Sequence, residues 1–359
     1  MAEIHAARRG RAQEKIAEAG ADAALITSGP NVRYLTGLAS SNAALLLTAD
    51  GAAVLATDSR YTLAAQRDCS DVELITERFI EPRLAAEMAS RGLGTVAFEA
   101  HEMTVERHAE LAAKAGDVKV TPFGRKIEEL RAVKDPSEIE LLGTACRISC
   151  QAIADVFPLI RPGMTERGLA AALDARMAGL GAERPAFDTI VASGPNGAIP
   201  HHAPTDRPLR RGDLITMDFG ALYGGYHADM TRTVALGEPA GWQREIYELV
   251  AAAQRSGLDA ARPGADVGDV DAAARDLIRD AGHGDHFQHG LGHGVGLEVH
   301  EAPTIGYGRT GKLASRVPVT VEPGVYLPGR GGVRIEDVLV VGADGTGLLT
   351  TTTRELLVL

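Results

Sequence analysis

Hydrophobic and polar positions in the first third of the chain follow helical and strand-like periods in turn. An amphipathic stretch extends to about Ala19, and short apolar runs follow at residues 22–27 and 43–48. The turn sequence at residues 49–51 leads into another apolar run at 52–57, so this part of the pattern predicts a β-hairpin. Helices that alternate with short strands predict a small α/β domain.

A helix start signal lies at Asp135-Pro136-Ser137-Glu138. It offers a capping carboxylate, a proline at the first helical position and a glutamate three residues after the cap. The change of pattern just before it predicts a domain boundary near residues 125–135. We therefore expect an N-terminal domain over residues 1–130 and a C-terminal domain over residues 131–359.

The C-terminal part repeats one pattern. Each copy contains two helical stretches separated by Arg-Pro-Gly, first at residues 161–163 and again about 100 residues later at 262–264. The predicted helices are about 136–157 and 165–181 in the first copy, and about 242–261 and 267–281 in the second. Such a repeat predicts a duplicated α/β half-domain, and two halves facing each other would leave a cleft between them.

Two aspartates lie on either side of the turn sequence Tyr223-Gly224-Gly225-Tyr226. Asp218 and Asp229 each fall in a strand-like segment rich in apolar residues. If the hairpin folds about Tyr223 and Gly224, Asp218 lies directly opposite Asp229. Like charges in that arrangement repel, so the pair requires a cation, a shared proton or a different register. A hard divalent metal ion is the simplest answer.

Two glutamates lie in strand-like segments of the second copy. Glu322 ends the segment 317–322 and Glu336 lies within 333–340, with a glycine-rich stretch between them. A single glutamate on a strand lies on a solvated face about as often as in a site. Glutamate is scarce in strand interiors and costly to bury unpaired, so four acids on two hairpins favour a buried site.

Histidines supply further candidate ligands. One cluster consists of His286, His289, His293 and His300. Glycines flank His293 at residues 292–296, but the strand and lysine of a phosphate-binding loop are missing. His201 and His202 follow a loop from which histidines are free to reach a site, and their spacing does not decide which of the two points inward.

Four carboxylates and one imidazole form an oxygen-rich ligand set with enough negative charge for two divalent ions. This set suits manganese or a similar ion better than a thiolate-rich zinc site would. Two ions about 3.5–4 Å apart can activate water at neutral pH and polarise a carbonyl, so hydrolysis is the natural use. Acyl-enzyme chemistry has little support because the chain has no G-x-S-x-G motif and no cysteine beside a base in the sequence.

Composition further narrows the possible functional classes of the protein. The 359 residues are 45% hydrophobic and 24% charged, as in folded globular proteins. A net charge of -11, with only a short basic run near residue 10, argues against binding to nucleic acid or to an anionic membrane. The three cysteines lack metal-type spacing, and neither an apolar signal core nor a bilayer-spanning stretch is evident. We therefore expect a cytoplasmic protein.

Five segments together resemble the pita-bread metallopeptidases, specifically the proline-specific branch of Xaa-Pro aminopeptidase (aminopeptidase P) and prolidase. In the family's order they are residues 217–220, 229–233, 292–296 with 299–301, 321–324 and 334–337. Residues 31–37 and 58–61 are similar to the creatinase-type N-terminal domain. The implied fold class is α/β (α+β): a creatinase-like N-terminal domain followed by a pita-bread catalytic domain with duplicated halves.

The resemblance also implies the site residues. Five would hold two divalent ions, for which Mn²⁺ is the expected metal and Co²⁺ and Zn²⁺ are alternatives: Asp218, Asp229, His293, Glu322 and Glu336. His201 would hydrogen-bond near the scissile group, and His300 would steady the substrate carbonyl or the tetrahedral intermediate. Arg334 would also belong to the active site, with Tyr326 and His202 as substrate-binding candidates.

The implied activity is hydrolysis of the bond between an N-terminal residue and a following proline. We expect a Xaa-Pro aminopeptidase, with a Xaa-Pro dipeptidase (prolidase) as the alternative. A creatinase-like hydrolase or a non-catalytic binding module on the same fold is disfavoured, because such relatives lose metal ligands that this chain keeps. The expected partners are a peptide with proline at the second position and further copies of the chain in a dimer or tetramer, without nucleic acid or membrane.

Overall fold

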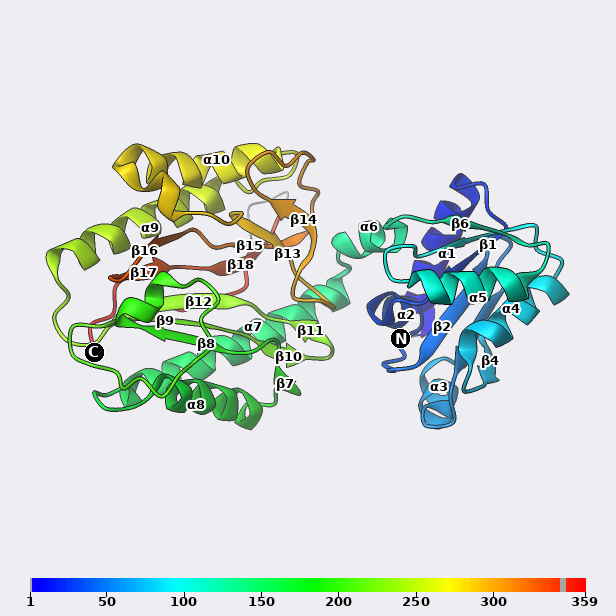
Figure 1. Ribbon diagram of the computed structural model, residues 1–359, viewed down its shortest axis with the longest axis horizontal. Coiled ribbons are helices and arrows are strands. Elements are labelled where there is room, and N and C mark those ends of the chain that lie inside the picture. The colour runs from blue at the N-terminus through cyan, green and yellow to red at the C-terminus, as the bar shows by residue number, and fades with distance from the viewer. Residues whose placement is uncertain (1, 343–346) are drawn as a thin grey trace. The chain divides into compact units, whose positions relative to one another are not determined.

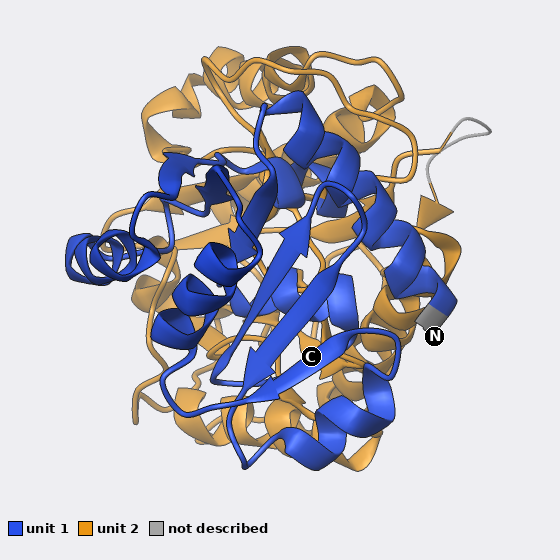
Figure 2. Cartoon of the chain, turned by 90° about the vertical axis from the view of Figure 1, so that its right-hand side faces the viewer, with its two compact units in different colours: residues 1–131 blue, residues 132–359 orange. Residues whose placement is uncertain are grey.

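The computed structural model describes residues 2–342 and 347–359. The chain forms two compact units, residues 1–131 and 132–359, which are coloured separately in Figure 2. Each unit has its own strands and its own buried apolar side chains. They are described here one at a time.

The first unit is built on a mixed sheet with strand order β4-β3-β2-β1-β5-β6. Its strands are β1 (Ala23–Ile26), β2 (Ala43–Thr48), β3 (Ala53–Thr57), β4 (Glu73–Thr76), β5 (Thr95–Phe98) and β6 (Lys119–Pro122). Its helices are α1 (Ala2–Glu18), α2 (Gly29–Thr36), α3 (Thr62–Asp68), α4 (Ile80–Ser90), α5 (Val105–Ala115) and α6 (Lys126–Ala132), which runs on into the second unit. Strands β2 and β3 pair antiparallel, which confirms the predicted hairpin. Leu84 and Met88 of α4 are fully buried and pack with Leu25 and Leu46 of the sheet.

Two pairs of helices enclose the strands of the second unit (Figure 1). They are α7 (Pro136–Val156) with α8 (Glu166–Gly179), and α9 (Gly241–Ala260) with α10 (Val267–Ile278). All four were predicted, and Asp135 and Glu138 form the expected capping box of α7. The pairs lie on opposite sides of the strands in Figure 1, each over its own apolar cluster. No helix in the described part of the chain combines the length and apolarity needed to cross a membrane.

The strands of the second unit, like its helices, divide into two halves. The first half contains β7 (Arg184–Pro185), β8 (Ile190–Ser193), β9 (Leu214–Phe219), β10 (Ala221–Tyr223), β11 (Tyr226–His227) and β12 (Met230–Ala235). The second half contains β13 (Gly292–Gly294), β14 (Glu301–Ile305), β15 (Pro318–Val321), β16 (Gly324–Leu327), β17 (Gly331–Arg334), β18 (Asp337–Val340) and β19 (Gly347–Leu348). They pair in the orders β12-β9-β8, β11-β10-β7, β14-β13-β15-β18-β19 and β16-β17.

The register of the first hairpin differs from the sequence-based expectation. Tyr223 pairs with Tyr226, so the turn is formed by Gly224 and Gly225, whose φ angles are 59° and 83°. Two consecutive residues with positive φ favour glycine, and a tyrosine in the turn would be strained. As a result Asp218 lies opposite Thr231, and the predicted pairing of Asp218 with Asp229 is wrong.

Asp229 lies instead at a break in the ladder, next to Gly220. A Cβ atom on Gly220 would lie only 1.8 Å from the carbonyl oxygen of Ala228. Only a glycine therefore allows the backbone segments at residues 220 and 228 to approach this closely. The break ends one stretch of pairing at β10 and β11 and starts the next at β9 and β12, with Asp229 between them.

The second hairpin is interrupted in the same way. The segment 333–340, predicted as one strand, is divided into β17 and β18, and β15 and β16 are separated at the facing position. Glu322 and Glu336 both occupy this interruption, because Val321 pairs with Asp337 and Gly324 pairs with Arg334. The Glu336 amide donates to the carbonyl oxygen of Thr231 at 3.1 Å, which brings the interruptions of the two hairpins together.

Candidate metal centre

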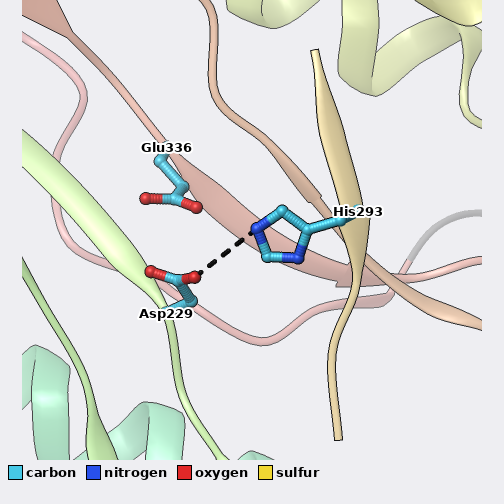
Figure 3. A group of neighbouring side chains, drawn as sticks. All are labelled: Asp229, His293 and Glu336. Carbon is cyan, nitrogen blue, oxygen red and sulfur yellow. Dashed lines mark ion pairs between the residues drawn. The ribbon is translucent and has the colours of Figure 1, made fainter. Parts of the chain in front are cut away.

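Three of the predicted ligands converge where the two hairpins meet. One ligand atom each from Asp229, His293 and Glu336 lies within 4.8 Å of the other two. Figure 3 shows both carboxylates facing the imidazole, with Nε2 of His293 3.7 Å from Oδ2 of Asp229. Asp229 and Glu336 are buried, so the cluster is shielded from solvent.

The other two predicted ligands border this cluster. Oε1 of Glu322 lies 3.3 Å from Nε2 of His293. Oδ2 of Asp218 accepts a hydrogen bond of 2.7 Å from Nη2 of Arg334, whereas its Oδ1 is buried without a hydrogen-bond partner among the described residues. A buried carboxylate oxygen left without a donor destabilises the fold unless a cation ligates it. The donor set therefore fits divalent cations.

Neighbouring groups orient the candidate ligands. Nδ1 of His293 lies 3.0 Å from the carbonyl oxygen of Gly294, which requires a proton on Nδ1. Nε2 is then the ring atom that faces the carboxylates and can bind a cation when its own proton is released. Thr231 donates through Oγ1 to Oε2 of Glu336 at 2.7 Å. Both contacts leave at least one ligand atom of each side chain free to bind an ion.

Electrostatics of the cluster also favour a cation. Burial raises the pKa of Asp229 and of Glu336 well above the usual carboxyl value, and the charges of neighbouring carboxylates raise both further. Burial opposes the charged form of His293, but the hydrogen bond and charge of Glu322 raise its pKa to about 9. Without a cation, therefore, the cluster retains protons, and bound cations would replace them.

The two adjacent histidines point to different partners. His202 donates through Nε2 to Oε2 of the buried Glu166 at 2.9 Å. The side chain of His201 is exposed, and the preceding residue, Pro200, accepts a hydrogen bond of 3.3 Å from Nη1 of Arg334, which also pairs with Asp218. Because His202 is bound by Glu166, His201 stays the candidate for the active-site role that the family resemblance implies.

His300 lies directly beside the candidate ligands. Its ring centroid is 4.4 Å from that of His293, in an edge-to-face arrangement. The next residue, Glu301, accepts a hydrogen bond of 2.6 Å from Nζ of Lys134, and both of these side chains are almost fully buried. This ion pair restrains the backbone that presents His300.

Arg334 and Tyr326 are buried and engaged with protein groups. Nη1 of Arg334 donates to Oη of Tyr326 at 2.9 Å, and its Nε donates to Oγ1 of Thr231 at 3.1 Å. The Tyr326 hydroxyl lies 2.8 Å from Nε2 of His289, whose Nδ1 lies 2.8 Å from the carbonyl oxygen of Gly290. This network links Asp218, through Arg334, to a histidine that motif matching did not single out.

Sequence reasoning missed Thr231 and Glu166, and it named His289 only as one member of the histidine cluster. Thr231 lies two positions after Asp229, and this strand spacing could have placed both side chains on one face. His289 precedes His293 by four residues within the histidine cluster. Glu166 had no such signal, because in sequence it reads only as the first residue of a helix.

Comparison with known proteins agrees with this geometry. Residues 140–343 match metallopeptidase family M24, and residues 8–133 match the creatinase/prolidase N-terminal domain. The chain therefore belongs to metallopeptidase family M24 and carries a creatinase/prolidase N-terminal domain. This result confirms the predicted family and fold class, including the pita-bread architecture of the second unit.

Individual relatives extend over nearly the whole chain. The Xaa-Pro dipeptidase of Pyrococcus horikoshii is 37% identical over 94% of this chain and 94% of its own length. The solved structure of a Xaa-Pro dipeptidase from Bacillus anthracis has a TM-score of 0.95 at 35% identity and covers 100% of both chains. That of an X-Pro aminopeptidase from Thermotoga maritima has a TM-score of 0.88 at 37% identity, covering 96% of this chain and 100% of the other.

Proposed function

We propose that this metallopeptidase is a Xaa-Pro dipeptidase, which releases proline from dipeptides that carry it in the second position. The convergence of Asp229, His293 and Glu336 carries the proposal, because it provides a metal-binding cluster in a chain of family M24. Full-length similarity to proteins named Xaa-Pro dipeptidase supports the dipeptide specificity. The sequence-based expectation was an aminopeptidase, favoured by chain length and the compact N-terminal domain, and the similarity to the Thermotoga maritima protein keeps that activity as the second candidate.

The proposed cofactor is a pair of divalent ions, for which Mn²⁺ suits four carboxylates and one imidazole. The residues that would hold them are Asp218, Asp229, His293, Glu322 and Glu336. The buried Oδ1 of Asp218 is available for this purpose because Arg334 occupies only Oδ2. When bound, such ions supply Lewis acidity at a carbonyl and lower the pKa of water toward neutrality.

The chain's own residues would hold the substrate carbonyl and stabilise its developing charge. His300 lies beside the candidate ligand His293, and His201 lies on the loop that Arg334 holds at Pro200. Each is proposed to donate a hydrogen bond to the carbonyl oxygen of the scissile bond. Burial lowers the pKa of His300, so at neutral pH its ring is a neutral donor. A peptide bond that precedes proline has no N–H group. Hydrogen bonds to the scissile bond can therefore be made only to its carbonyl oxygen.

Hydrolysis of two matched substrates tests the proposal. Gly-Pro and a longer Xaa-Pro-Xaa peptide would be incubated with chelated protein, with and without added Mn²⁺, and release of the N-terminal residue would be followed. Cleavage of Gly-Pro alone supports a dipeptidase, whereas cleavage of the longer peptide supports the aminopeptidase. Cleavage of neither by the metal-loaded protein rejects a proline-specific activity.

Assembly and location stay predictions from the family resemblance and from composition. A dimer or tetramer is expected, and light scattering coupled to gel filtration measures it directly. A cytoplasmic location is tested by fractionating cells and assaying Gly-Pro hydrolysis in each fraction.

A further inference from the structure

Glu166 is a fully buried carboxylate that lies outside the candidate metal centre. Each of its oxygens accepts three hydrogen bonds, all from residues 193–205. Oε1 accepts from the amide (2.8 Å) and hydroxyl (2.7 Å) of Ser193 and from Nδ2 of Asn196 (2.9 Å). Oε2 accepts from Nε2 of His202 (2.9 Å) and from the amide (3.1 Å) and hydroxyl (2.6 Å) of Thr205. One side chain thus ties both ends of this loop to the start of α8.

Helix α8 does not need the Glu166 carboxylate as its cap. Thr165 is the N-cap residue, and its Oγ1 accepts from the amide of Gly168 at 3.0 Å. The six bonds keep Glu166 ionised although it is buried, and they lower its pKa to about 2. Because all six donors belong to one loop, we infer that Glu166 stabilises that loop rather than its own helix.

The restrained loop carries His201. His202 is directed at Glu166, whereas the side chain of the adjacent His201 is exposed. The loop is also held from the side of the metal centre, because Nη1 of Arg334 donates to the carbonyl oxygen of Pro200 at 3.3 Å. His201 is therefore placed between two anchors, one at Arg334 and one at Glu166.

We propose that Glu166 and His202 are positioning residues for His201 in the peptidase reaction. This inference rests on the proposed function, in which His201 donates to the scissile carbonyl. The six hydrogen bonds from residues 193–205 to Glu166, called the clamp below, fix the loop before substrate binds. His201 therefore needs no reordering when the substrate carbonyl arrives. His202 serves the reaction through Glu166 and does not contact the substrate.

Three substitutions test the hydrogen bonds by which Glu166 holds the loop. Glu166→Gln keeps the shape but replaces one acceptor oxygen by an NH₂ group, which leaves three donors facing a donor. His202→Phe removes one donor, and His202→Gln restores an NH group near the position of Nε2. We expect kcat for Gly-Pro to fall roughly 10- to 100-fold in Glu166→Gln and in His202→Phe, with KM and metal content unchanged and with recovery in His202→Gln.

A double-mutant cycle separates positioning from general damage. If Glu166 acts through His201, then Glu166→Gln added to His201→Ala lowers kcat by less than about twofold beyond His201→Ala alone. Thr189→Val is the matched control, because it removes a hydrogen bond from Thr189 to Asp174 on the same helix without touching the loop. We expect Thr189→Val to keep the wild-type kcat. Independent, multiplicative losses in the cycle would overturn the proposal, as would a lowered Tm with full kcat in both Glu166→Gln and His202→Phe.

Hydrogen–deuterium exchange tests the clamp without relying on activity. The amides of Ser193 and Thr205 donate to Glu166, so we expect faster exchange of peptides 193–205 in Glu166→Gln. Unchanged exchange there would reject the clamp even if the protein is a dipeptidase. Should Glu166→Gln fail to fold, the same comparison is made between His202→Phe and His202→Gln. If the wild type cleaves neither proline peptide, the proposed function fails while exchange still decides whether the clamp exists.

Discussion

The buried Arg334 and the partly buried Asp218 form an ion pair that uses only one oxygen of the carboxylate. Nη2 of Arg334 lies 2.7 Å from Oδ2 of Asp218, and Oδ1 of Asp218 has no hydrogen-bond partner among the described residues. Arg334 also donates to Tyr326 and Thr231. The guanidinium therefore sets the orientation of the carboxylate and keeps one oxygen available to a cation.

Arg334→Lys should weaken metal binding with the charge retained. A lysine has no planar fork and cannot contact Asp218, Tyr326 and Thr231 at once. We expect metal affinity to fall about 10- to 100-fold, measured by titration calorimetry on chelated protein. Arg309→Lys, at an exposed position, is the control and should bind as the wild type does. Equal affinities of Arg334→Lys and wild type would show that Arg334 does not orient a ligand.

Removal of a proposed ligand should differ from removal of a proposed carbonyl donor. Asp229→Ala or Glu336→Ala should abolish turnover and lower the metal content, because each lies in the central cluster. His300→Ala should keep its metal and lose about 10²- to 10³-fold in kcat, the usual loss for one donor to a developing oxyanion. Elemental analysis alongside Gly-Pro kinetics distinguishes the cases. A metal-replete Asp229→Ala protein with full activity would reject this site.

Chelation should inactivate the protein reversibly. The candidate ligands are oxygen-rich, so Mn²⁺ should restore turnover to chelated protein more fully than a thiolate-seeking ion would. Dialysis against a chelator, followed by separate additions of Mn²⁺, Co²⁺ and Zn²⁺, measures the order of recovery. Recovery with none of these ions, in protein that is still folded, would count against a metal-dependent reaction.

Stability of the metal-free protein should depend on pH through the buried acids. The pKa values of Asp229 and Glu336 are raised by burial and by neighbouring carboxylates, so the folded state holds protons that the unfolded chain releases above about pH 4. This contribution to the free energy of unfolding is fully present below that pH and is lost as pH rises through the raised pKa values.

Urea unfolding of chelated protein tests this linkage. The free energy of unfolding of the wild type, relative to that of Asp229→Asn, should fall as pH rises above about 4, the unfolded carboxyl pKa. Excess Mn²⁺ should remove the fall, because the cation takes the place of the protons. A difference that rises with pH in the metal-free proteins would contradict the raised pKa of Asp229.

Local signals made much of the fold predictable. The capping residues Asp135 and Glu138 define the start of α7, and short apolar runs define the strands. The register around Asp218 was not predictable in this way, because it depends on which two residues form the turn. Tyr223-Gly224 and Gly224-Gly225 are both reasonable turn sequences, and only the positive φ angles of both glycines decide between them.

The site was predictable to the extent that its residues lie in recognisable segments. Motifs pointed to all five candidate ligands, and the structure brings Asp229, His293 and Glu336 within 4.8 Å of one another, with Glu322 beside His293. The contact between Glu166 and His202 joins residues 36 positions apart, and nothing in the local sequence of either residue indicates it. The same holds for Lys134 and Glu301, which are 167 positions apart. Such pairs become visible only when the chain is folded.

The duplicated halves have a consequence for how the second unit can be divided. Asp218 and Asp229 belong to the first half, and His293, Glu322 and Glu336 belong to the second. Neither half has the full ligand set, so fragments cut in the connection before α9 should each be inert, and activity should return only on mixing them. Competence for hydrolysis is thus a property of the reassembled pair, and its dependence on fragment concentration would report how tightly the halves associate.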